Sequence, residues 1–60
     1  MNNINIMIRM TINALDEIEK LAHQDAINFS LPGPERSRAN KIAHTCRKAI
    51  ASFEDVLAEK

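Results

Sequence analysis

Apolar residues recur at every second position over the first dozen residues of this 60-residue chain. The alternating apolar positions are Ile4, Ile6, Ile8, Met10 and Ile12. A period of two is typical of a half-buried strand, because alternate side chains of a strand point to opposite faces. A strand this short needs a partner strand, and the nearest source is a second copy of the chain. The pattern therefore predicts a strand over residues 4–10 that pairs between two copies.

A single helix from about residue 4 to residue 28 explains the same residues differently. Its apolar stripe consists of Ile4, Met7, Ile8, Thr11, Ala14, Leu15, Ile18, Leu21 and Ala22. This helix leaves Ile6, Met10 and Ile12 facing water or another subunit, and exposed apolar clusters usually mark an interface. If the strand forms instead, the first helix runs over residues 12–28. We take strand-then-helix as the primary prediction and the long helical hairpin as the alternative.

Residues 30–34, with the sequence SLPGP, end the first helical segment and turn the chain, because proline disrupts a helix interior. Pro34 suits the first position of a following helix, and Glu35 in its first turn complements the helix dipole. Apolar residues then recur with helical spacing at Ala39, Ile42, Ala43, Cys46, Ala49, Ile50, Phe53, Val56 and Leu57. We predict a loop over residues 29–33 and a helix over residues 34–58.

The small size of the chain favours assembly. Sixty residues form a single small domain, and such a chain buries only about 60% of its unfolded surface. Cys46 is the only cysteine, so it forms no internal disulfide, and its place in the apolar stripe predicts a buried small side chain. Phe29 and Phe53 are expected in the core. Oligomerisation remains the common way to enlarge such a core, so we expect a homodimer or a larger oligomer.

The charge distribution is neutral overall but locally uneven. The net charge is zero, which gives no global attraction to nucleic acid or membranes. Residues 36–53 carry five cations and no acid: Arg36, Arg38, Lys41, Arg47 and Lys48. A basic segment of this kind can meet an anion even on a neutral chain.

Several functional classes are not expected. No apolar run approaches the roughly 20 residues of a membrane span, and no signal peptide is evident, so we expect a cytoplasmic protein. The metal-ligating residue types are not clustered, so no metal or cofactor is expected. No nucleophile comes with an evident base, and there is no glycine-rich phosphate loop. We therefore predict that the protein is not an enzyme.

Two stretches resemble the ribbon-helix-helix repressors of the Arc and Mnt type. In residues 4–22, Ile6-Met7-Ile8-Arg9-Met10-Thr11 precedes Leu15, Ile18, Leu21 and Ala22. In residues 36–50, Arg36-Ser37 precedes Ile42, Cys46 and Ile50. The order of the two stretches on a short chain makes the match more specific than either alone. The resemblance implies a homodimeric DNA-binding transcriptional repressor that inserts an antiparallel ribbon into the major groove.

The ribbon-helix-helix resemblance implies base-reading residues on the outward side of the ribbon. They would be Asn5, Met7 and Arg9. Asparagine can pair with adenine and arginine with guanine, whereas methionine offers only apolar contact to a base edge. Met7 therefore departs from the polar residue expected at that place in the family.

The same resemblance implies phosphate contacts at the start of the second helix. Arg36, Ser37 and Arg38 would hold the DNA backbone, with free backbone N–H groups near Ser37 directed at a phosphate. Residues 32–34, Pro-Gly-Pro, replace the short glycine turn of the family and lengthen the linker. The lack of net positive charge is a second departure, because phosphate neutralisation supplies most non-specific DNA affinity.

A weaker resemblance supports the all-helical alternative. In this chain a first helix is followed by Leu31-Pro32, and a second helix then opens with Glu35, Ser37 and Ala39. This order of helices and turn is similar to the hairpin of small viral proteins that sequester cyclic-nucleotide immune signals. That resemblance implies a helical oligomer holding phosphates at helix ends, although the tryptophan and the Leu-Glu-Glu pattern of that hairpin are missing. The alternative function is a non-enzymatic oligomer that binds a protein partner, or a small phosphorylated nucleotide ligand through residues 36–48, as in viral anti-defence proteins.

Overall fold

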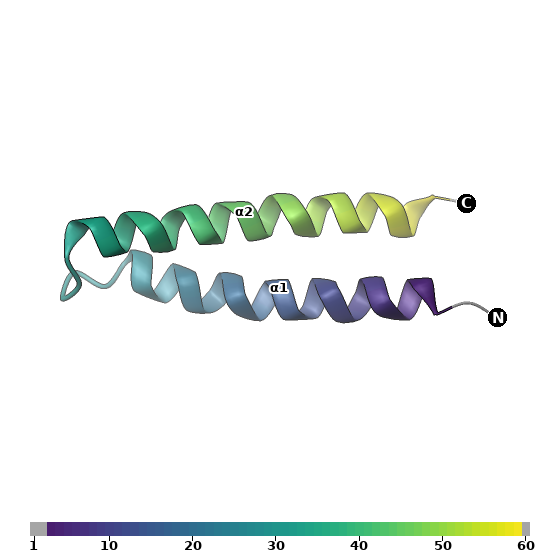
Figure 1. The fold of residues 1–60 in the computed structure, drawn as a ribbon, viewed down its shortest axis with the longest axis horizontal. Helices are drawn as coiled ribbons and strands as arrows, with labels where there is room; N and C mark the ends of the chain where they lie inside the picture. Colours follow the sequence, from purple (N-terminus) through teal and green to yellow (C-terminus); the bar gives the residue numbers. More distant parts are fainter. Residues whose placement is uncertain (1–2, 60) are drawn as a thin grey trace.

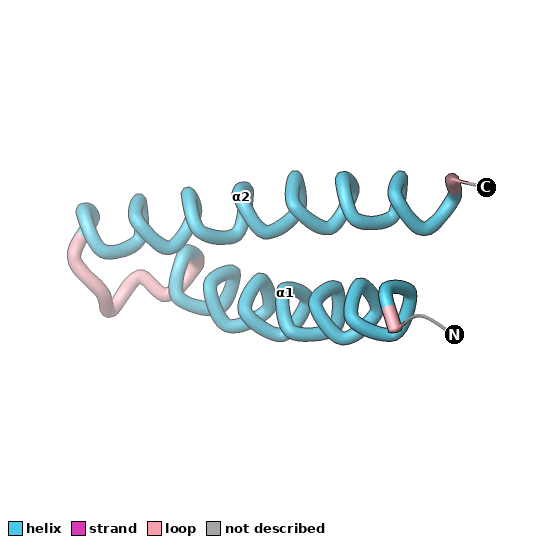
Figure 2. The backbone as a smooth tube through the Cα atoms, turned by 45° about the vertical axis from the view of Figure 1, so that its right-hand side comes forward, coloured by secondary structure: helices cyan, strands magenta, loops and turns pink. Residues whose placement is uncertain are grey.

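Two long antiparallel helices joined by a short turn form the whole fold (Figure 1). The computed structural model describes residues 3–59. Helix α1 spans Ile4–Ala26 and helix α2 spans Gly33–Ala58. The hairpin measures 49 × 14 × 11 Å, and its two termini lie at the same end. Figure 2 shows helix and loop throughout the described residues and no strand.

The strand predicted over residues 4–10 is wrong, because these residues form the first turns of α1. Ile8 is buried, whereas Ile6 and Met10 are 57% and 65% exposed. A strand would place these three side chains on one face, but a helix turns by about 100° per residue and directs only one of them at α2. The helix also satisfies its backbone hydrogen bonds within one chain, which a lone strand cannot do. The alternative of a helical hairpin agrees with the structure.

The helices meet along a seam of residues spaced alternately by three and four positions, the spacing of an antiparallel coiled coil. On α1 the seam consists of Ile8, Ile12, Leu15, Glu19, Ala22 and Ala26. On α2 it consists of Arg36, Ala39, Ala43, Cys46, Ile50, Phe53 and Leu57. All of these residues are buried or half-buried. The seam is therefore the intramolecular core.

An ion pair between Glu19 and Arg47 identifies the register of the two helices. It places Glu19 level with Cys46, and the heptad spacing then places Ala22 level with Ala43. Near the turn the apolar members of the seam are alanine and cysteine, which permit close approach of the helices. Towards the termini it consists of larger residues. Cys46 is a buried free thiol, as predicted.

The turn comprises residues 27–32, two residues earlier than the predicted loop start. The Asn28 side-chain oxygen accepts the Ser30 backbone N–H at 3.0 Å, and the Asn28 carbonyl accepts the Leu31 N–H at 3.0 Å. These bonds replace helical ones and allow the chain to leave α1. Because of them α1 ends at Ala26 rather than at the predicted residue 28.

Arg36 anchors the start of α2 to the turn. Its Nε donates a hydrogen bond to the Leu31 carbonyl at 3.2 Å, and its guanidinium lies 4.9 Å from the centre of the Phe29 ring. Phe29 is 84% exposed, so its predicted core position is wrong. The ring forms a cation–π contact instead of filling the interior. Helix α2 begins at Gly33, one residue before the predicted start, and ends at the predicted residue, Ala58.

Candidate interaction surfaces

The seam divides the hairpin into two opposite faces. Residues immediately before each seam position lie on one side of the seam, and residues immediately after it lie on the other side, because each residue advances about 100° around the helix axis. Two antiparallel helices are related by a two-fold axis perpendicular to the plane that contains them. Rotation about this axis exchanges the helices and leaves each face of the hairpin on its own side. The residues that precede the seam on α1 and on α2 therefore share one face.

The face that precedes the seam is apolar, and we call it the apolar face. Its large side chains are Met7, Ile18 and Leu21 from α1 and Ile42 and Val56 from α2, and they are between 43% and 63% exposed. Thr11, Ala14, Thr45, Ala49 and Ser52 fill the positions between them. Charged residues occur only near the turn, where Asp25, Glu35 and Arg38 precede seam positions. Two continuous apolar stripes thus lie in parallel along the hairpin.

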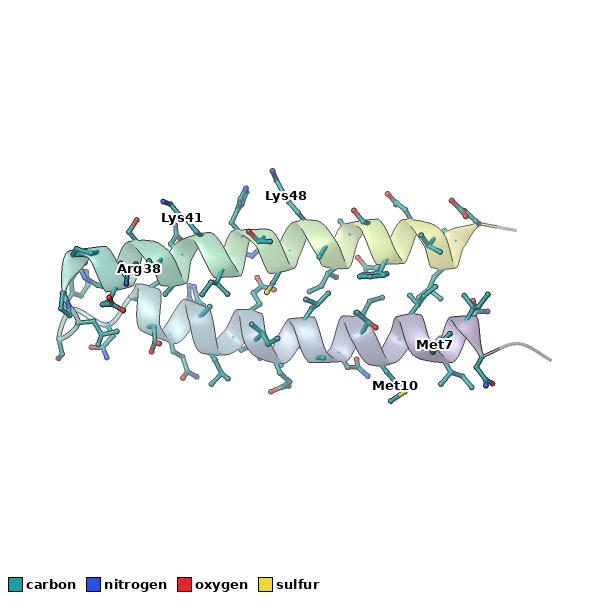
Figure 3. All side chains as sticks on the ribbon, viewed as in Figure 1. Met7, Met10, Arg38, Lys41 and Lys48 are labelled. Carbon is teal, nitrogen blue, oxygen red and sulfur yellow. The ribbon has the colours of Figure 1, made fainter. Side chains whose placement is uncertain are left out.

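This surface differs from the interface expected for a helical hairpin, which was Ile6, Met10 and Ile12. Ile12 is half-buried in the seam. Ile6 lies outside the apolar face, and Met10 projects away from α2 at its edge (Figure 3). All five large residues of the apolar face were missed as interface residues, because helical spacing had assigned them to the apolar stripes of the two helices: Met7, Ile18, Leu21, Ile42 and Val56. The signal for them was present: the apolar stripes are wider than one seam can bury.

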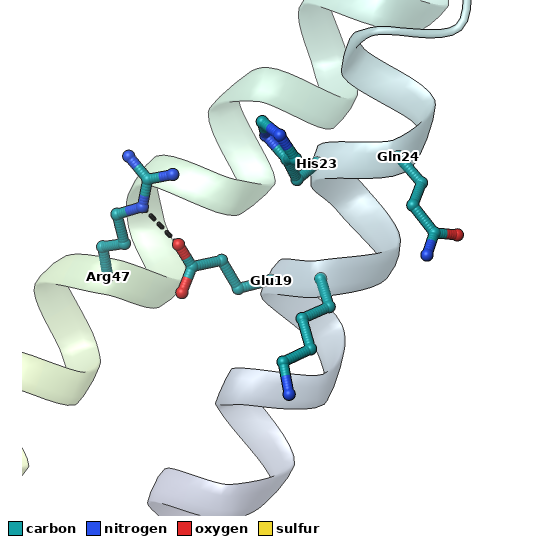
Figure 4. Close-up of a pocket in the computed structure, with 5 residues that line it drawn as sticks. Glu19, His23, Gln24 and Arg47 are labelled. Atoms are coloured by element: carbon teal, nitrogen blue, oxygen red, sulfur yellow. Dashed lines mark hydrogen bonds and ion pairs between the residues drawn. The ribbon is translucent and has the colours of Figure 1, made fainter.

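The opposite face is polar and contains a hollow of about 360 Å³ that is open to solvent. Its lining residues are Glu19, Lys20, His23, Gln24 and Arg47 (Figure 4). The Glu19 side chain leaves the seam to reach Arg47 and is 17% exposed, whereas Arg47 is 61% exposed. The hollow therefore lies beside an ion pair that joins the helices.

The charges around this hollow are compensated. Lys20 pairs with Asp16 at 3.1 Å and lies 3.8 Å from Glu17. The hydrogen bond to Asp16 and the charges of both carboxylates raise the pKa of Lys20 above its ordinary 10.5. With Glu19 held by Arg47, the carboxylate and both cations that line the hollow have partners on the protein. The arrangement explains helix stability better than ligand capture.

The structure does not bring together the three residues predicted to read bases. Met7 belongs to the apolar face, whereas Arg9 follows a seam position and lies on the polar side, with Asn5 one turn before it. All three are exposed on a helix. Within residues 3–59 no strand is present from which a ribbon could form.

The residues predicted to bind phosphate lie together, but both arginines have partners. Arg36 contacts the turn as described above, and Arg38 forms an ion pair with Glu35 at 2.9 Å. Ser37 is exposed, but α2 begins at Gly33, so the N–H of Ser37 lies within the helix. The expectation of free N–H groups near Ser37 is therefore wrong, because α2 starts at Gly33, about one turn before Ser37.

A different basic surface lies on the outer side of α2. Lys41 and Lys48 project away from α1 (Figure 3), and His44 lies between them one turn from each. Within the described residues neither lysine forms an ion pair. We call Lys41, His44 and Lys48 the basic ridge.

Comparison with family models, curated proteins and solved structures finds no match for the chain. Residues 3–59 contain no group of three or more side chains placed to hold a metal ion. In the same part of the chain, neither helix has the length and hydropathy needed to cross a bilayer. The surfaces themselves are therefore the basis for a functional proposal.

Proposed function

We propose that the protein is a non-enzymatic interaction protein that works as an assembly of helical hairpins joined through the apolar face. The observation that carries this proposal is the set of five large, half-exposed apolar side chains on one face of the hairpin, Met7, Ile18, Leu21, Ile42 and Val56. Single exposed apolar residues are ordinary on protein surfaces. Several large apolar residues gathered on one face, with charged residues only near the turn, are typical of an interaction surface.

The thin interior of the hairpin supports the same proposal. The buried core residues of the described chain are Ile8, Ala22, Ala39, Ala43 and Cys46, and no side chain among residues 3–59 is fully buried. Four of these five residues are small. Covering the apolar face adds stabilisation of about 25 cal/mol for each Å² of apolar surface removed from water. A short chain with so small a core gains most from a partner.

Ile18→Glu tests the proposal, because it places a charge in the middle of the apolar face, where association would bury it without a partner. Ile6→Glu is the matched control on the same helix, since Ile6 is exposed and lies outside that face. In size-exclusion chromatography with light scattering, we expect the wild type and Ile6→Glu at a multiple of 6.8 kDa. We expect Ile18→Glu at the monomer mass.

The proposal fails if the wild-type protein is a monomer at about 100 µM, a concentration at which even a weak micromolar assembly is populated. It also fails if both glutamate variants assemble as well as the wild type. Circular dichroism of Ile18→Glu shows whether its helices persist when the assembly is lost.

The basic ridge favours a second candidate function, the binding of a small phosphorylated ligand. Lys41 and Lys48 have no acidic partner within the described residues, and both are directed away from α1. Their side chains can therefore meet phosphate oxygens. Calorimetric titration with a cyclic dinucleotide, and with the parent nucleoside as an uncharged control, tests this candidate. Binding that survives Lys41→Gln together with Lys48→Gln would exclude the ridge as the site.

A further inference from the structure

Charges of both signs lie at the turn end of the apolar face, where Arg38 pairs with Glu35 on α2 and Asp25 lies on α1. Asp25 on α1 precedes the seam residue Ala26, and Arg38 on α2 precedes the seam residue Ala39. The register indicated by the Glu19–Arg47 ion pair places these two alanines level with each other. Asp25 and Arg38 therefore lie on the same face, one on each helix, and are offset along the hairpin by two residues, or about 3 Å. This asymmetry restricts how a second copy can cover the face.

A second copy can stack on the apolar face in two symmetric ways. A two-fold axis parallel to the helices puts both turns at the same end and lays α1 of each copy on α2 of the other. A two-fold axis across the helices puts the turns at opposite ends and lays α1 on α1. All neighbouring helices are antiparallel in both arrangements, so helix packing alone does not select one.

The charges at the turn end favour the arrangement with the turns at the same end. There Asp25 of each copy faces Arg38 of the other, at the edge of the buried face. Arg38 already pairs with Glu35 of its own chain at 2.9 Å, so in this arrangement its guanidinium lies between two carboxylates. With the turns at opposite ends, Asp25 would instead cover the first turns of α1 in the other copy, beside the exposed Met7. An acid buried against apolar surface without a partner is strongly unfavourable.

The outer edges of the two helices favour the same arrangement. Glu17 on α1 and Lys48 on α2 are level in the register, and each points away from the neighbouring helix of its own hairpin. Turns at the same end bring Glu17 of one copy beside Lys48 of the other, like the flanking ion pairs of coiled coils. Turns at opposite ends bring the two copies of Lys48 near each other, because Lys48 lies close to the middle of α2.

The size of the hairpin also suits a second copy. The Cα trace is 49 Å long and 14 Å wide, so one full side of the molecule, with the turn and the charged end included, measures about 700 Å². A stable protein interface buries about 800 Å² on each partner. A second hairpin of the same length covers the stripe from one end to the other.

We infer that a second copy of the chain covers the apolar face with its turn at the same end, with Asp25 of each copy paired to Arg38 of the other. This inference rests on the proposed assembly and names its partner and orientation. The product is a four-helix bundle in which each α1 lies between two α2 helices. In each basic ridge Lys48 lies beside Glu17 of the other copy, whereas Lys41 and His44 stay on the outside of this bundle.

Distances between the two turns test the orientation directly. Ser30 is exposed in the turn, and only its backbone N–H takes part in the turn hydrogen bond, so Ser30→Cys can carry a nitroxide label. Cys46→Ala provides the background, since alanine already occupies the preceding seam position, Ala43. Double electron–electron resonance on the full chain measures the distance between the two labels of the dimer. We expect a distance under about 30 Å, because packed helices lie about 10 Å apart and the two label side chains add the rest. A separation near or above the 49 Å hairpin length overturns the orientation.

Charge reversal provides an independent test that does not depend on labels. Arg38→Asp places like charges together at both symmetric sites and is expected to weaken dimerisation at least about tenfold. Asp25→Arg combined with Arg38→Asp restores opposite charges and is expected to recover most of the lost affinity. Sedimentation equilibrium measures the dissociation constants. A double variant no tighter than Arg38→Asp alone overturns the pairing.

The outcomes separate this inference from the proposed function. A dimer with short turn-to-turn distances and charge rescue supports both. A dimer with long distances, or without rescue, overturns the orientation and leaves assembly through the apolar face intact. A monomer of 6.8 kDa overturns both proposals.

Discussion

Replacing Ile8 by alanine, with Ile6→Ala as its partner experiment, tests whether the first residues pack as a helix. Ile8 is buried in the seam, and the change removes three carbons at about 0.8 kcal/mol each, plus a small cavity term. We expect a loss of about 2–3 kcal/mol in the free energy of unfolding. Ile6 is exposed, so its truncation should cost less than about 1 kcal/mol. Both changes raise helix propensity equally, so propensity cancels in the comparison.

Thermal unfolding followed by circular dichroism at one fixed protein concentration measures the difference. For a domain of this size each kcal/mol corresponds to a Tm shift of about 4–8 °C, so Ile8→Ala should melt about 10–20 °C below the wild type. Ile6→Ala should melt within a few degrees of it. In a strand, Ile6 and Ile8 share a face. Equal losses for the two variants would therefore refute the helical packing described here.

Three further changes test the seam and the turn. Ala43→Leu should lower the free energy of unfolding by about 1–3 kcal/mol in a urea titration, because it overpacks the seam. Ala51→Leu, at an exposed position of the same helix, should change it little. Equal effects would mean that the helices are not close at Ala43. Arg47→Ala should lower the free energy of unfolding by about 0.5–1 kcal/mol, because it leaves the largely buried Glu19 without its ion-pair partner. Glu19→Leu should be neutral or stabilising in the same assay, since it removes a charge from the seam. The reverse ranking would show that Arg47 does not compensate the charge of Glu19. Phe29→Ala should cost under about 1 kcal/mol in thermal melts, because the ring is exposed and forms only a cation–π contact; a loss of about 3 kcal/mol or more would indicate a buried ring.

The turn and the second helix could be predicted from the residues because local chemistry decides them. Pro32 and Pro34 around Gly33 interrupt any helix, and the apolar spacing after them is helical without ambiguity. The predicted bounds of α2 agree with the structure to within one residue at the start and match it at the end. The end of the first helix depends instead on hydrogen bonds made by Asn28, and the spacing of apolar residues does not predict these bonds.

The first segment was misjudged because its apolar residues satisfy both periods. Five alternating apolar residues also supply Ile8 and Ile12 at a helical spacing of four. Local pattern could not decide between the two, and packing did: only a helix lets Ile8 and Ile12 cover Leu57 and Phe53 along the far half of α2. The predicted ribbon, with its base-reading residues, depended on this one choice.

The two apolar stripes of each helix explain why folding and assembly belong together in this molecule. Near the turn the seam consists of Ala22, Ala43 and other small residues, while the large Leu21 and Ile42 at the same heights lie on the apolar face. A monomer of maximal stability would place these large side chains in the seam. In this chain much of the apolar surface is instead held on a face that one hairpin cannot cover. In the proposed assembly the free energy of burying this face becomes available when a second copy covers it, so we expect the stability of the hairpin to rise with protein concentration by mass action.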